Sequence, residues 1–128
     1  MTWERRTFLA GTAAAAVVGP FGAMAKGTGM YGLIGKMTAQ PGKRAELTAI
    51  LLDGVAGMPG CLSYVVADDP AEADTIWITE VWTDQVSHVA SLQMPLVRDA
   101  ITRGRPLIAG MERIAETRPL GGTGLSAR

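Results

Sequence analysis

The sequence contains no asparagine, and only one cysteine and one histidine among its 128 residues. One thiol and one imidazole cannot build a structural zinc site or a disulfide framework within a single chain. Neither sign of charge dominates, since twelve basic residues balance twelve acidic ones, and this excludes the electrostatic footprint of a nucleic-acid-binding protein. With 48% hydrophobic and 19% charged residues, the composition is that of one globular domain.

The first 25 residues have the order of an export signal. Arg5 and Arg6 precede an alanine-rich apolar run at residues 8–18, and a small-x-small triplet follows at residues 23–25. Paired arginines before such a run are typical of the twin-arginine route, and the run is shorter than the ~20 residues that span a membrane. We therefore expect a cleaved signal and an exported, for example periplasmic, protein without a stable membrane anchor. An N-terminal amphipathic helix or a retained anchor is the alternative.

Cleavage after Ala25 would leave residues 26–128 as a single domain, with a core at residues 30–118 and a glycine-rich tail at residues 119–128. Runs of β-branched, aromatic and alternating apolar residues are typical of strands. Such runs predict four strands, at residues 30–39, 61–67, 75–83 and 111–117.

Apolar residues three and four positions apart predict two helical regions between these strands. The first runs from Pro41 to Met58, where a Gly and a Pro-Gly pair end it. The second begins after Thr83 or Asp84, either of which can cap it. A proline at position 95 divides this region into two pieces. The second piece carries an apolar stripe as far as Ile108. The order β-α-β-β-α-β predicts an α+β fold with the split pattern of ferredoxin-like folds.

The strand at residues 75–83 is largely apolar on both faces. In a four-stranded sheet with helices on one face, the other face would present Trp77 and Val81, or their counterparts, to water. A large exposed apolar patch of this kind usually marks an interface. We therefore expect a homodimer in which two such sheet faces pair.

Few polar side chains could carry chemistry. Glu80 and Trp82 share one face of the strand at residues 75–83 with Ile78, and His88 follows in the first turns of the next helix. A strand end, a short turn and a helix start can bring such side chains to the mouth of one apolar cavity, which is a common small-ligand site. Tyr64 can line the same cavity from the neighbouring strand.

Each of these residues also has a purely structural interpretation. Imidazole titrates near neutrality, so His88 is the candidate base, but it can equally be a helix histidine that completes a hydrogen bond. Trp82 and Tyr64 can be cavity walls or core packing. Glu80 is more informative, because a carboxylate on an apolar strand face must find a partner, either His88, an arginine such as Arg98, or water.

Four segments carry a family resemblance: Y-G-L-I-G-K-M-T-A, P-G-K-R-A-E-L, M-P-G-C-L-S-Y and, most specifically, T-E-V-W-T-D-Q-V-S-H-V-A-S-L-Q-M-P. With them, residues 30–125 resemble the antibiotic biosynthesis monooxygenase family and its quinol monooxygenase-like subgroup. The resemblance implies a dimeric α/β barrel that oxidises quinols or phenolic polyketides with O2, without a flavin, metal or haem cofactor. It also implies Trp82 as a ring wall, His88 as the base and Glu80 as its orienting partner.

The chain departs from the family pattern at two points. Some members place an Asn in the pocket, and many carry a second His near the position of Met94 or Pro95; both are missing here. Because the haem-degrading relatives depend on such an Asn, haem degradation is not expected. Three functions remain open: a cofactor-independent monooxygenase for a quinol or related hydroxylated aromatic, a non-catalytic dimer that binds small aromatics, and a structural dimer with a packed interior.

Overall fold

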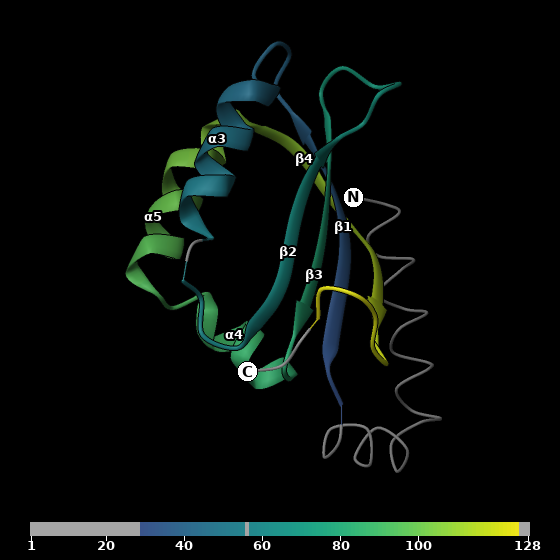
Figure 1. Ribbon diagram of the computed structural model, residues 1–128. Helices are drawn as coiled ribbons and strands as arrows, with labels where there is room; N and C mark the ends of the chain where they lie inside the picture. Colours follow the sequence, from purple (N-terminus) through teal and green to yellow (C-terminus); the bar gives the residue numbers. More distant parts are fainter. Residues whose placement is uncertain (1–28, 56, 126–128) are drawn as a thin grey trace, which may run out of the picture.

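The computed structural model describes residues 29–55 and 57–125. Within these residues the chain forms one antiparallel sheet and three α-helices (Figure 1). In the sheet the strands stand in the order β2-β3-β1-β4. The expected export signal at residues 1–25 lies outside the described residues. The elements are β1 (Tyr31–Ala39), α3 (Arg44–Gly54), β2 (Cys61–Asp68), β3 (Thr75–Trp82), α4 (Gln85–Ser91), α5 (Pro95–Gly104), the short 3-10 helix η1 (Arg105–Leu107) and β4 (Ile108–Thr117).

The predicted ferredoxin-like α+β order is confirmed, including the division of the second helical region at Pro95. Asp84, one of the two predicted caps, caps α4: its side chain accepts a hydrogen bond from the backbone N–H of Ser87. No helix among the described residues has the length and apolar character that crossing a membrane requires.

Two predicted helix boundaries are wrong. The helix predicted over 41–58 is shorter, because Gly42 adopts a φ of 77°, which an α-helix cannot include, and the chain leaves the helix at Val55. The apolar stripe after Pro95 does not stay helical as far as Ile108 either. There the chain passes through η1, which contains Pro106, and Ile108 already pairs with Ala39 as the first residue of β4.

The apolar core lies between the sheet and α3. Its buried members are Met37, Ala39, Leu47, Ile76 and Ile78. The helices α3 and α5 lie side by side above this face of the sheet (Figure 1). Their close approach depends on Gly54, where an added Cβ would lie 2.5 Å from the Cβ of Ala100.

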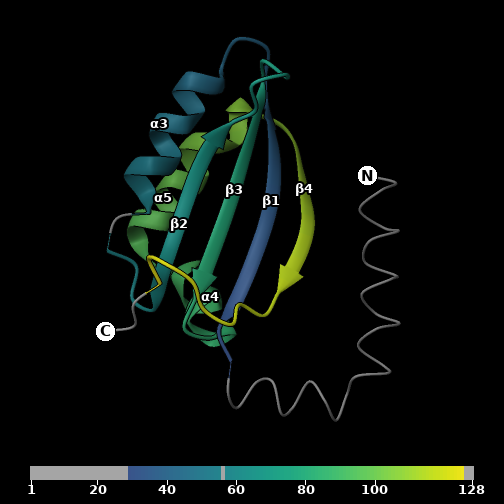
Figure 2. The ribbon, with the colours of Figure 1, turned by 45° about the vertical axis from the view of Figure 1, so that its right-hand side comes forward.

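The opposite face of the sheet is covered by none of the described helices (Figure 2). Trp77 lies on this face opposite Lys36, and its indole N–H donates a hydrogen bond of 2.8 Å to Asp69. Lys36 Nζ lies 5.6 Å from the centre of the same indole and 3.7 Å from a carboxylate oxygen of Glu112. Val81 lies on this face as well, as the alternation of β3 predicts.

Candidate functional site

The end of β3 and the start of α4 form the site. Alternation along β3 turns Glu80 and Trp82 toward the helices, on the same face as the core residue Ile78. The chain turns immediately after Trp82, and the cap at Asp84 starts α4 at the lower end of the sheet (Figure 1). One turn further along α4, His88 lies over the two β3 side chains.

Glu80, Trp82 and His88 lie in contact, as the sequence predicted; that they line the mouth of a ligand cavity stays a prediction. The indole N–H of Trp82 donates a 2.9 Å hydrogen bond to Glu80 Oε1, and His88 Nε2 lies 3.8 Å from the same oxygen. The rings of Trp82 and His88 meet edge to face, with centroids 5.4 Å apart. The side chains of Glu80 and His88 are only 15% and 14% exposed. The carboxylate is therefore fixed by the indole and faces the imidazole from a largely dry position.

The electrostatics of the site are set by burial. Desolvation raises the pKa of Glu80 above its usual value, while the Trp82 hydrogen bond and the charges of His88 and Arg113 act in the opposite direction. When His88 carries a proton, its charge faces this carboxylate at 3.8 Å and forms an ion pair with it. With a hydrogen on Nε2, the lone pair lies on Nδ1, which leaves that nitrogen able to accept a proton from a ligand.

The other predicted site residues lie deeper. Trp82 is 1% exposed, so its indole is part of the packed interior and holds Glu80; its role as a ring wall stays a prediction. Ile78 belongs to the buried core. Tyr64 lies opposite Glu80 in the pairing of β2 with β3, and desolvation raises the pKa of its phenol. Whether a ligand contacts Ile78 or Tyr64 stays a prediction too.

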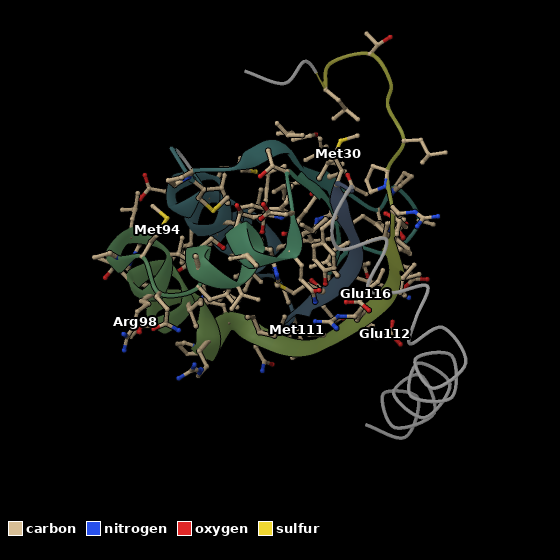
Figure 3. The ribbon with its side chains drawn as sticks, turned by 90° about the horizontal axis from the view of Figure 1, so that it is seen from below. Met30, Met94, Arg98, Met111, Glu112 and Glu116 are labelled. Carbon is tan, nitrogen blue, oxygen red and sulfur yellow. The ribbon has the colours of Figure 1, made fainter. Side chains whose placement is uncertain are left out.

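Arg98, proposed as one possible partner of Glu80, lies exposed on α5. Figure 3 shows it on the α5 side of the molecule, away from Glu116 on β4. The carboxylate of Glu80 interacts with Trp82 and His88 instead.

Sequence reasoning missed two residues of this site. The ring of Tyr31 lies beside His88, with centroids 5.5 Å apart, and its hydroxyl donates a 2.5 Å hydrogen bond to Glu116 Oε2. Burial and the Glu116 carboxylate both raise the pKa of Tyr31. The predicted order of elements could have indicated this contact. A split βαβ order places the first and last strands side by side, with the start of β1 beside the end of β4.

The described residues contain no group of three or more His, Cys, Asp or Glu side chains placed to hold a metal ion. A hollow of about 370 Å³ lies elsewhere, between α3 and the end of β2. Arg44 lines it, but its guanidinium donates to the backbone carbonyls of Asp69, Glu72 and Thr75 and so fastens the loop before β3. None of the residues that line this hollow belongs to the His88 site.

Comparison with known proteins gives consistent matches. The family model described as antibiotic biosynthesis monooxygenase matches residues 30–103. A solved structure from Chloroflexus aurantiacus J-10-fl, assigned by name to the same family, is 61% identical with a TM-score of 0.73, and the match covers 76% of this chain and 99% of that one. The search among curated proteins gives no match.

Two more distant structures share the fold. One, from Caulobacter crescentus CB15 and assigned by name to the same family, is 23% identical with a TM-score of 0.65, over 73% of this chain and 92% of that one. The other, SnoaB from Streptomyces nogalater, is a cofactor-independent oxygenase; it is 17% identical with a TM-score of 0.63, over 75% of this chain and 98% of that one. At these identities the likeness concerns the fold alone.

Proposed function

Because the chain belongs to the antibiotic biosynthesis monooxygenase family, we propose that it is a cofactor-independent monooxygenase that oxidises a quinol or a related hydroxylated aromatic with O2. The observation that carries this proposal is the convergence of Glu80 and His88, which are both largely buried, on the edge of Trp82. A base held beside a partner carboxylate is what proton abstraction from an aromatic hydroxyl requires.

In this proposal His88 takes the hydroxyl proton of the substrate, and Glu80 stabilises the imidazolium that results. The phenolate left behind is electron-rich enough to pass an electron to O2, so the substrate is its own reductant. One oxygen atom enters the ring and the other leaves as water, with the two electrons and two hydrogens that this water needs supplied by oxidation of the quinol to a quinone. SnoaB, which is described as a cofactor-independent oxygenase, is a precedent on the same fold for oxygenation without a cofactor.

The test is oxygen uptake by the purified protein with a panel of hydroquinones. We expect His88→Ala to lower the rate about a hundredfold, the usual size of one general base, with Ser87→Ala on the same helix as the matched control. Equal uptake by the wild type and His88→Ala would contradict the assignment of the base. No uptake with any hydroquinone would contradict the activity.

A second function is favoured by the missing asparagine. The sequence has no Asn to donate a hydrogen bond to a reduced oxygen species, which suits a protein that binds small aromatics without turnover. Isothermal titration calorimetry separates the two functions. Tight binding of a hydroquinone in air, with no oxygen consumed and the ligand recovered unchanged, would establish the binding protein over the enzyme.

We also propose that the open face of the sheet pairs with the same face of a second copy. It carries Trp77 and Val81, and Val65 in the neighbouring strand is 51% exposed. Two-fold pairing would remove this apolar surface from water. Light scattering should give twice the chain mass for the wild type and the single-chain mass for Val65→Lys, whereas Thr102→Lys on the exposed side of α5 should stay dimeric. A monomeric wild type at micromolar concentration would contradict the pairing.

Export by the twin-arginine route is a further proposal, supported by Arg5, Arg6 and the apolar run that follows. Residues 1–30 fused to a reporter should carry it out of the cytoplasm. Replacing both arginines by lysine should retain the reporter in the cytoplasm. The control uses the full chain, in which a double substitution at Lys36 and Lys43 should leave export unchanged.

A further inference from the structure

The hydroxyl of Tyr31 donates its proton in a hydrogen bond to Glu116. It lies 2.5 Å from Glu116 Oε2, and an ionised carboxylate can only accept, so the phenol donates. Arg113 Nη1 lies 3.6 Å from the same oxygen and forms an ion pair with it. Toward any other group the Tyr31 oxygen therefore offers lone pairs alone and acts only as an acceptor.

This oxygen belongs to the same site as the base. The Tyr31 ring lies 5.5 Å from the His88 ring, between centroids, and projects from the helix-covered face of the sheet toward α4. The ring comes from the first residue of β1 and its partner carboxylate from the end of β4, the outer strand on which Figure 3 shows Glu112 and Glu116. The hydrogen bond between Tyr31 and Glu116 lies at the exposed rim of this cluster, where a ligand can reach it.

We propose that Tyr31 is a specificity-determining residue, whose hydroxyl oxygen accepts a hydrogen bond from a hydroxyl group of the aromatic ligand while Glu116 holds its proton. The inference rests on the proposed function and deepens it by naming the redox form that the site selects. A hydroquinone carries hydroxyl donors that satisfy the Tyr31 acceptor. The corresponding quinone carries carbonyl oxygens there, so acceptor would face acceptor, an arrangement that loses a hydrogen bond and adds repulsion.

The consequence is a site that binds the reduced ring and releases the oxidised one. The discrimination between hydroquinone and quinone depends on the hydroxyl proton of Tyr31, which is hydrogen-bonded to Glu116 and not to the ligand. It therefore operates on binding alone and does not require that oxygen be present or that turnover occur.

The experiment is anaerobic calorimetry with durohydroquinone and duroquinone, a fully methylated hydroquinone and its oxidised form, which have nearly the same shape and no free ring position for reaction with Cys61. We expect the wild type to bind the hydroquinone about tenfold more tightly than the quinone. Tyr31→Phe keeps the ring that packs on His88 and removes the acceptor, so the ratio of the two dissociation constants should fall toward one. A purely structural role of Tyr31 would change both constants together and leave their ratio unchanged.

Glu116→Gln supplies the second test. Its amide can donate to the Tyr31 oxygen and so free the hydroxyl to donate, which should also lower the ratio although the tyrosine is present. Glu112→Gln is the matched control, since this carboxylate on the same strand pairs with Lys36 on the other face of the sheet.

Three outcomes would overturn the inference: a wild-type ratio near one, an unchanged ratio in Tyr31→Phe, or no binding of either ligand. Loss of the proposed function is a separate result. Selective anaerobic binding that disappears in Tyr31→Phe, together with no oxygen uptake in air, would contradict catalysis and support this inference. Oxygen uptake that depends on His88, together with an unchanged binding ratio in Tyr31→Phe, would do the reverse.

Discussion

The two ends of β3 present the same face to the helices and do different work. At the upper end Ile76 and Ile78 belong to one buried apolar cluster with Leu47 of α3. The lower end lies next to α4 (Figure 1). There Glu80 and Trp82 pack against His88 of α4, through a hydrogen bond between the first two, a 3.8 Å approach of the imidazole to the carboxylate and a ring edge. One strand thus carries both part of the core that stabilises the fold and two residues of the candidate site.

Burial has opposite effects on the free energy of folding at the two ends. Burying Ile76 lowers the free energy of the folded state, because apolar surface leaves water. Burying Glu80 raises the free energy of its charged form, and this desolvation raises the pKa of that carboxyl. Strained or costly groups of this kind are typical of functional sites, and the apolar end of the same strand offsets the cost.

The largest expected effect is at the apolar end. Leu47→Ala removes a side chain with no exposed surface and should lower the free energy of unfolding by about 3 kcal/mol, measured by urea denaturation. Leu52→Ala on the same helix is the control, since Leu52 is 53% exposed, and it should cost about 0.5 kcal/mol. Oxygen uptake per folded molecule should survive in both variants. Equal losses of stability in the two variants would mean that the buried Leu47 contributes no more than an exposed leucine, and would contradict the role of the apolar end of β3 in stability.

A smaller effect is expected at the start of α4. Asp84→Ala removes the acceptor of the Ser87 backbone N–H, so α4 should fray and His88 should lose its fixed place over Glu80. Hydrogen exchange of the α4 amides should accelerate while the core amides of β3 stay protected. Asp84→Asn, which can still cap, is the control. Faster exchange of the α4 amides and the β3 core amides together would contradict a difference in stability between the two ends of β3.

The same cap has a pH signature. Hydrogen bonds from Ser87 hold the pKa of Asp84 below its ordinary value, so its contribution to stability is complete above the ordinary carboxyl pKa. That contribution is lost as the pH falls through the depressed pKa, and the difference in Tm between the wild type and Asp84→Ala should vanish in acid. A difference that persists at low pH would mean that the aspartate acts through something other than its charge.

The smallest change, and the one with opposite sign, is expected for Glu80→Gln. Because burial raises the pKa of Glu80, the native state holds more protons than the unfolded state between the unfolded and the native pKa. The wild type therefore loses stability as the pH rises through that interval, and the neutral amide does not. Glu80→Gln should melt a few degrees higher at neutral pH and match the wild type in acid, while its oxygen uptake falls. The exposed Glu46→Gln should change neither property.

The sequence predicted the contact between Glu80, Trp82 and His88 because local rules suffice for it. Alternation along one strand places the first two residues on one face, and a capped helix start places the third within reach. The helix ends were harder. Gly54 lies inside α3 because Ala100 of a later helix leaves no room for a Cβ, and no local pattern contains that contact.

Tyr31 and Glu116 were missed for the same reason at larger scale. Their hydrogen bond joins residues 85 positions apart, through the pairing of β1 with β4. Each residue by itself looks ordinary, a tyrosine at a strand start and a glutamate at a strand end. Only the strand order of the fold, applied residue by residue, brings them together.

The pairing of the first strand with the last also governs how the molecule is made. A nascent chain still on the ribosome can pair β1 with β3, but until residues 108–117 emerge, one edge of β1 stays open and the Tyr31 hydroxyl lacks its acceptor. Contacts that span so much of the chain are slow to form. The contact between Tyr31 and Glu116 can thus form only late in synthesis, and a C-terminal truncation before Glu116 would yield a sheet without the rim that we propose selects the ligand.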